Sequence, residues 1–148
     1  MNRIVRCAAA CLFLAAALPA AADPAAAPAA GQAAKPMRVV VQISESDPKT
    51  WNLALNNARN AQKDAGAANI EIEIVAFGPG LDMLRDDSLV ANRVLEAQSG
   101  GVRFVACRNT MQAQHLTEAD MIGGIGYAQA GVIEIIRKQM EGFAYLRP

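Results

Sequence analysis

The sequence contains few of the residues that build metal sites and disulfides. It has three cysteines and one histidine in 148 residues. Two of the cysteines, Cys7 and Cys11, fall in a predicted leader peptide, which leaves Cys107 with no partner in the folded part of its own chain. One cysteine and one histidine are too few for the three or four protein ligands that zinc usually takes. We therefore expect no metal, no organic cofactor and no dithiol chemistry within one chain.

Excess charge of one sign is also absent. The 14 Lys and Arg residues balance the 14 Asp and Glu residues, and aromatic residues make up 5% of the chain. No stretch forms a basic stripe of the kind that attracts a phosphate backbone. The composition therefore argues against a nucleic-acid partner.

No apolar run reaches the roughly 20 residues that a membrane-spanning helix needs. The run over residues 7–18 follows the basic residues Arg3 and Arg6 and precedes small residues that end at Ala22, which is the pattern of a secretory signal peptide. An uncleaved membrane anchor is the alternative, and the short, Ala-rich run argues against it. We expect a signal peptide over residues 1–22, cleavage near Ala22, a periplasmic location and no membrane contact afterwards.

Residues 23–36 consist almost entirely of Ala and Pro. A segment of this composition has no periodic apolar pattern and nothing to bury, so we predict a disordered, semi-extended tether. The remaining residues, 37–148, are enough for one small domain with a single core.

Strand and helix patterns alternate along this domain. Strands are predicted at 37–43, 70–77, 102–107 and 143–146, and helices at 48–65, 88–99, 110–115 and after the glycine-rich loop 123–126. Strands separated by helices pair in parallel through right-handed crossovers. The prediction is an α/β fold with a doubly wound, mainly parallel sheet of about five strands and helices on both faces.

Two amphipathic patterns predict which side chains meet solvent. Isoleucines alternate with Glu71 and Glu73, so we expect a half-exposed strand with both carboxylates in water. The last helix is expected to turn its apolar residues inward and its charged residues outward. The inward set is Val132, Ile133, Ile136 and Met140, and the outward set is Glu134, Arg137, Lys138 and Glu141.

Candidate binding residues follow three of the predicted strands. The carboxyl ends of parallel strands share one edge of a sheet, and ligands bind there. We therefore expect Ser44, Gly78, Gly80 and Cys107 to converge on one crevice. The Gly78–Gly80 segment lacks the third glycine of a dinucleotide fingerprint, so we interpret it as a turn.

Cys107 ends a buried strand just before a predicted short helix. If Asn109 or Thr110 caps that helix, free backbone N–H groups point near the sulfur and favour a thiolate, to which Arg108 could add positive charge. The alternative is an inert buried thiol, because free cysteine often packs as a small hydrophobe. His115 is either a base near Cys107 or an exposed residue at a helix end.

Two further features have open interpretations. Asn56 lies in a predicted helix, where asparagine is unfavourable, so it is either solvated or hydrogen-bonded to a neighbouring loop or a partner subunit. We include it among the candidate binding residues. The glycine-rich loop 123–126 is either a backbone nest for an anion or a flexible connection.

Several segments form a recognisable set, although no single one is specific. They are WNLALNN at 51–57, FGPG at 77–80, VACRNTM at 105–111, and the closing residues from Gly124 to Pro148. With these residues the chain resembles the DsrE/DsrF-like family over nearly all of 37–148.

The resemblance implies a flavodoxin-like fold and a homo-oligomer, either a trimer or a hexamer. The best understood members of the family are cytoplasmic sulfur-relay proteins that carry sulfane sulfur as a persulfide on one cysteine. Cys107 lies where that cysteine falls. The predicted export is a departure from those members.

The leading hypothesis is therefore a periplasmic sulfur-handling protein. Cys107 would take sulfane sulfur from a donor protein and pass it to an acceptor thiol. Two alternatives stay open: a non-catalytic module that binds a small anion or metabolite in the strand-end crevice, and an oligomeric scaffold in which Cys107 is inert.

Overall fold

The computed structural model describes residues 35–148. The predicted signal peptide and the predicted tether up to residue 34 lie outside the described residues. Within the described part, five parallel strands form one sheet in the order β4-β3-β2-β1-β5. The strands are β1 (Met37–Ile43), β2 (Ile70–Ala76), β3 (Arg103–Cys107), β4 (Gly126–Ala128) and β5 (Ala144–Leu146).

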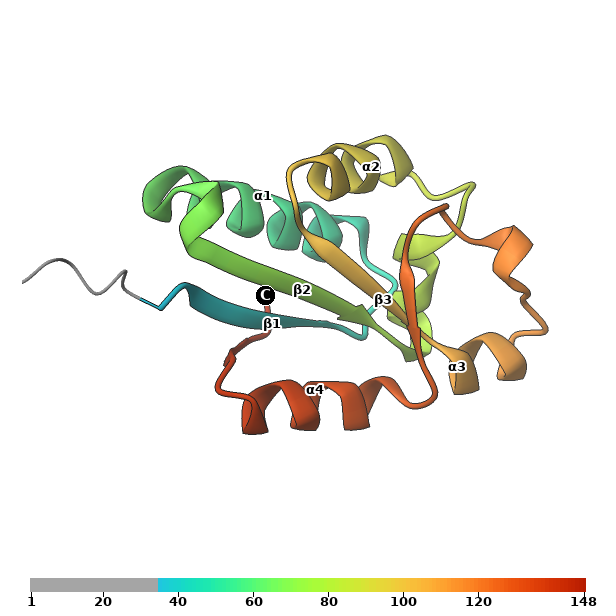
Figure 1. Ribbon diagram of the computed structural model, residues 1–148. Helices are drawn as coiled ribbons and strands as arrows, with labels where there is room; N and C mark the ends of the chain where they lie inside the picture. Colours follow the sequence, from blue (N-terminus) through green and yellow to red (C-terminus); the bar gives the residue numbers. More distant parts are fainter. Residues whose placement is uncertain (1–34) are drawn as a thin grey trace, which may run out of the picture. The chain divides into compact units, whose positions relative to one another are not determined.

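Helices cover both faces of this sheet, so the predicted fold class is confirmed. Helices α1 (Pro48–Ala65) and α2 (Ala91–Ser99) lie over one face, and α4 (Gly131–Met140) lies over the other (Figure 1). The short helix α3 (Arg108–Ala113) follows β3 at the carboxyl edge of the sheet. Strand β4 is an addition to the expected elements, because three residues after a glycine-rich loop carry no readable strand pattern.

The ends of α1 follow from local chemistry. Asp47 caps the helix by accepting hydrogen bonds from the Lys49 backbone N–H at 3.0 Å and the Thr50 hydroxyl at 3.1 Å. Pro48 occupies the first helical position, where its missing N–H costs nothing. Gly66 ends the helix with a φ of +84°, a conformation that glycine adopts without strain.

Alternate residues of β1, β2 and β3 supply two hydrophobic layers. Ile74 and Phe104 are buried with Leu55 between the sheet and the α1–α2 face. A smaller cluster is buried on the α4 side of the sheet; it comprises Val40, Val75, Ile135 and Phe143. A turn of 3₁₀-helix, Gly78–Leu84, follows β2 and contributes three further fully buried side chains, Leu81, Met83 and Leu84.

Glu73 is buried, so the prediction that it faces water is wrong. Its side chain points from β2 toward α4 and is only 3% exposed. Arg103 lies 2.9 Å from its Oε2 atom, and the Lys138 ammonium lies 3.4 Å from the same oxygen. Glu71 is partly buried and pairs with Arg103 at 2.7 Å. The alternating pattern did not reveal that a helix covers this polar face.

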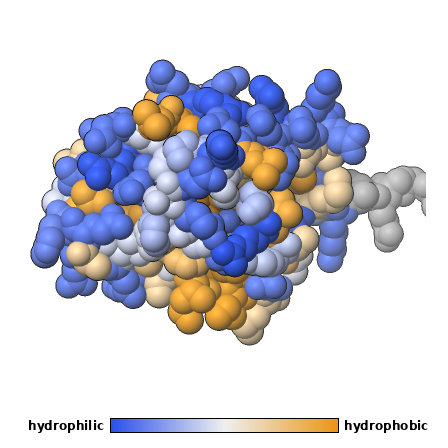
Figure 2. Space-filling model, turned by 180° about the vertical axis from the view of Figure 1, so that it is seen from behind, coloured by the Kyte–Doolittle hydropathy of each residue, from blue (hydrophilic) through white to orange (hydrophobic). Residues whose placement is uncertain are grey.

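Helix α4 is rotated relative to the prediction. Glu134 and Lys138 face the sheet and are 7% and 9% exposed. The four apolar residues that were expected inside are exposed instead: Val132, Ile133, Ile136 and Met140, at 53%, 58%, 47% and 85%. Figure 2 shows an apolar patch at the lower edge of the molecule, where α4 lies in Figure 1. We call these four residues the α4 apolar face.

The buried carboxyl group of Glu73 gives a prediction about stability. Burial raises the pKa of Glu73, as does its hydrogen bond with Glu134, while Lys138 and Arg103 lower it and leave a net rise. The folded protein therefore binds a proton more tightly than the unfolded chain does. Its stability should fall as the pH rises above the ordinary Glu value and through the raised one. Urea unfolding from pH 4 to pH 8 measures the slope of the free energy of unfolding against pH.

Glu73→Gln should remove that part of the pH dependence, because an amide does not ionise. Glu71→Gln is the matched control on the same strand and should keep the wild-type slope. Identical pH profiles for wild type and Glu73→Gln would contradict the assignment.

Candidate functional site

The carboxyl ends of β1, β2 and β3 meet at one edge of the sheet. Ser44 follows β1, and a Cβ atom on Gly80 would lie 2.7 Å from its backbone nitrogen and 2.5 Å from the Ile43 carbonyl oxygen. Only glycine permits this close approach of the turn after β2. The Gly78 N–H donates to the Thr110 hydroxyl oxygen at 2.9 Å, which joins the same turn to the segment after Cys107.

Cys107 is the last residue of β3 at this edge. It is 4% exposed and is itself the N-cap of α3, because the helix begins at Arg108 directly after β3. The expectation that Asn109 or Thr110 caps this helix is therefore wrong by two or three residues. Their backbone N–H groups belong instead to the first turn, which is nearest the sulfur.

Hydrogen bonds favour the thiolate form of Cys107. Burial by itself raises the pKa of the thiol. Hydrogen bonds from the Thr110 hydroxyl and from the backbone N–H groups of Gly131, Thr110 and Asn109 outweigh burial, so the pKa of Cys107 is lowered from its ordinary value. Gly131 is the first residue of α4, so the N-termini of two helices converge on one sulfur.

Thr110 connects the turn after β2 to the thiol. Its oxygen accepts the Gly78 N–H, and its hydroxyl proton remains available to donate to the sulfur. Gly78 has a φ of +55°, so a left-handed backbone aims this N–H at Thr110. Gly78 therefore acts on the site through Thr110.

Two exposed residues close over the sulfur. The Gln129 backbone carbonyl accepts from the Asn109 N–H at 3.1 Å and from the Cys107 thiol at 3.8 Å. The Gln129 side-chain amide donates to the Asn109 side-chain oxygen at 2.7 Å. These contacts explain why a thiol at the protein edge is nearly inaccessible.

Unlike Thr110, Arg108 and His115 do not take part in the hydrogen bonds around the Cys107 sulfur. The Arg108 guanidinium lies 2.7 Å from Glu118 and stacks 4.7 Å above the Tyr127 ring. His115 is exposed, has a φ of +56° and lies past the end of α3 that is remote from Cys107.

Asn56 is not at this edge. It faces α2 from α1, and its side-chain oxygen accepts from Arg93 at 2.8 Å. Two residues that sequence reasoning missed, Gly131 and Gln129, do belong to the site. Their only sequence signal is a polar residue and a glycine before an apolar run, which says nothing about their distance from Cys107.

Neither metal ligation nor membrane spanning is indicated in residues 35–148. That segment has no group of three or more His, Cys, Asp or Glu side chains that could hold a metal ion. The helices of the same segment are each too short or too polar to cross a bilayer.

The fold and the site define a class: an α/β protein with one thiol of lowered pKa where β3 meets α3. The chain belongs to the DsrE/DsrF-like family, which it matches over residues 37–148. Membership in this family suggests a role related to sulfur relay. None of the curated proteins compared with it matches.

The solved structures that are similar to this chain include two proteins of unknown function. A protein of unknown function from Methanobacterium thermoautotrophicum is 39% identical with a TM-score of 0.73, and the match covers 76% of this chain and 99% of that one. A conserved protein of unknown function from Bacteroides thetaiotaomicron is 17% identical with a TM-score of 0.60, and the match covers 75% of this chain and 94% of that one. The second likeness concerns the fold alone.

Thr110 provides the test of thiol activation. Thr110→Val removes the hydroxyl at nearly constant volume, so the pKa of Cys107 should rise and its alkylation at pH 7 should slow. Thr110→Ser keeps the hydroxyl and should behave like the wild type. The measurement is the iodoacetamide rate against pH. A midpoint in the wild type at or above the free-cysteine value of about 8.5 would contradict activation.

Proposed function

We propose that this protein is a periplasmic sulfur carrier that holds sulfane sulfur as a persulfide on Cys107. The observation that carries the proposal is the position of Cys107 at the N-cap of α3, where Thr110, Asn109 and Gly131 lower the pKa of its thiol. A thiolate is the form of cysteine that attacks sulfur. Family membership supports sulfur as the cargo.

The transfer is a pair of balanced exchanges. The Cys107 thiolate attacks the outer sulfur of a donor persulfide, the donor's S–S bond breaks, and the donor leaves as a thiolate. An acceptor thiolate then attacks the outer sulfur of the Cys107 persulfide, and Cys107 leaves as a thiolate. Neither step consumes an oxidant or a reductant. The N–H groups that stabilise the Cys107 thiolate also stabilise it as the leaving group.

The hydrogen-bonded cover suits a carrier in an oxidising compartment. Gln129 and Asn109 shield the sulfur, so a stray thiol meets a residue with 4% of its surface exposed. A docked donor that takes over the hydrogen bonds of Gln129 would open the path to the sulfur. This arrangement offers one way to keep a lone cysteine usable outside the cytoplasm.

Intact-mass spectrometry tests the carrier role. Purified protein, incubated with polysulfide and then desalted, should gain the mass of one sulfur atom. Cys107→Ser should gain none, and added thiol should remove the sulfur from the wild type. Polysulfide that leaves the wild type unmodified, under conditions in which iodoacetamide alkylates Cys107, would refute the proposal.

A second candidate role, assembly with copies of itself, is favoured by the α4 apolar face. Four apolar side chains that are 47–85% exposed on one helix are costly to leave in water. Arg137 and Glu141 flank the patch on the same helix and form an ion pair at 3.6 Å. A second copy of the face would therefore bring both signs of charge to the contact, as a self-complementary interface requires. The partner we propose is another copy of this chain.

Ile136→Glu should weaken this assembly, because it buries a carboxylate in an apolar contact. Light scattering coupled to size-exclusion chromatography should show an oligomer for the wild type and a shift toward monomer for the variant. Leu89→Glu is the control, since Leu89 is 85% exposed and lies away from α4. A monomeric wild type at high concentration would exclude the interface.

A further inference from the structure

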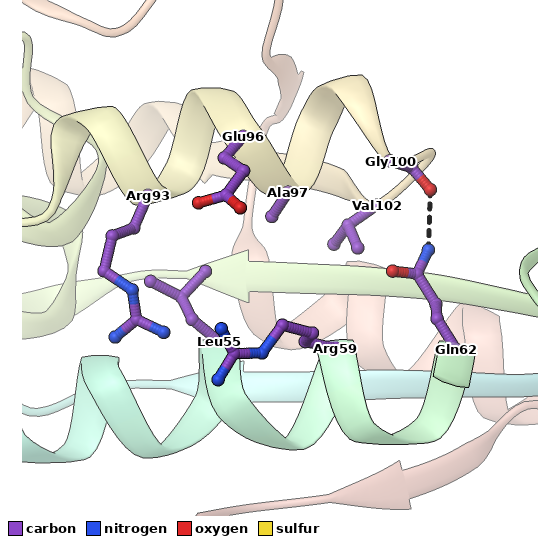
Figure 3. Close-up of a pocket in the computed structure, with 8 residues that line it drawn as sticks. All are labelled: Leu55, Arg59, Gln62, Arg93, Glu96, Ala97, Gly100 and Val102. Carbon is purple, nitrogen blue, oxygen red and sulfur yellow. Dashed lines mark hydrogen bonds between the residues drawn. The ribbon is translucent and has the colours of Figure 1, made fainter. Parts of the chain in front are cut away.

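A separate groove lies between α1 and α2, on the face of the sheet opposite α4. Its volume is about 180 Å³. Its floor is apolar, because Leu55, Ala97 and Val102 line it. The Gln62 side-chain amide donates to the Gly100 carbonyl at 2.7 Å and ties the two helices together at one end (Figure 3).

Two arginines from facing helices enter this groove. Arg93 extends from α2 toward α1, and Arg59 extends along α1 (Figure 3). The Arg93 guanidinium donates to the side-chain oxygens of Asn52 and Asn56, the latter at 2.8 Å. Arg59 donates to the same Asn56 oxygen at 3.4 Å. One neutral oxygen therefore holds two cationic groups close together.

This arrangement leaves positive charge without compensation. Within residues 35–148, neither Arg59 nor Arg93 has a carboxylate oxygen within 4 Å, although Glu96 also lines the groove. Two guanidinium groups on a neutral acceptor repel one another, and an anion placed between them would relieve the repulsion. Guanidinium groups also match the planar, two-oxygen geometry of a carboxylate.

We propose that this groove binds a small organic carboxylate. The carboxylate would meet Arg59 and Arg93, and a short apolar body would lie over Leu55, Ala97 and Val102. Asn52 and Asn56 have the role of holding Arg93 in place, which explains two unfavourable residues inside a helix. The site is independent of sulfur transfer, because Val102 lies before the start of β3 and Cys107 at its end.

Nuclear magnetic resonance titration of the full chain tests this site. The backbone signals of residues 35–148 are followed as the ligand is added. Isovalerate is the probe, since its branched body suits a groove of this size. Its amide, isovaleramide, has the same shape without the charge. Isovalerate should bind with a Kd of about 1 mM or tighter, as expected for so small a ligand, and shift backbone signals of α1 and α2. Isovaleramide should bind at least about tenfold more weakly, as expected for the loss of a charged hydrogen bond.

Arg59→Gln should weaken isovalerate binding about tenfold for the same reason. Arg59 is exposed, so this variant should fold, and Arg93→Gln provides the second variant. Lys63→Gln removes the same charge from α1 outside the groove and should bind normally, as should Cys107→Ser. Equal binding by wild type and Arg59→Gln would overturn the proposal. So would an isovalerate response no stronger than the response to isovaleramide or inorganic phosphate.

Discussion

The buried contact between Glu73 and Lys138 determines how α4 lies on the sheet. Glu73 projects from the central strand β2, and Lys138 reaches it from α4 at 3.4 Å. A buried carboxylate is costly unless it is paired, and Lys138 of α4 adds a second cation beside Arg103 of β3. Meeting that requirement turns Glu134 inward as well, and it leaves Val132, Ile133, Ile136 and Met140 on the outside. This orientation of α4 leaves a polar contact in the interior and an apolar surface in water.

The same rotation of α4 completes the thiol site. With the helix held this way, the Gly131 N–H lies beside Cys107, and a Cβ atom on residue 131 would lie 3.0 Å from Phe77. Glycine at the start of α4 therefore lets the helix end approach both the strand β3 and the turn after β2. The sulfur chemistry proposed at Cys107 and the self-association proposed for α4 thus depend on the same packing of α4 against the sheet. The arginine groove lies on the other face and is formed by α1, α2 and the segment that joins α2 to β3.

Much of the architecture follows from local patterns. Asp47 and Pro48 specify the start of α1, and the strand–helix alternation specifies a parallel sheet. A thiol at the end of β3 must then lie at the ligand-binding edge. The hydrogen-bond partner of the Asn56 side chain could not be predicted in this way. Its partner Arg93 is distant in sequence, and only packing of α2 on α1 brings the two together.

The sequence by itself determined the fold class, the order of the elements other than β4, and the position of Cys107 at a strand end, because these depend on residue periodicity and caps within short windows. Tertiary structure alone decided which face of α4 is buried, which N–H groups reach the sulfur and which residues cover it. The physical reason is that hydrophobic periodicity identifies two faces of a helix but does not say what each face meets. Here a buried carboxylate on β2 selected the charged face, against the preference of the apolar one.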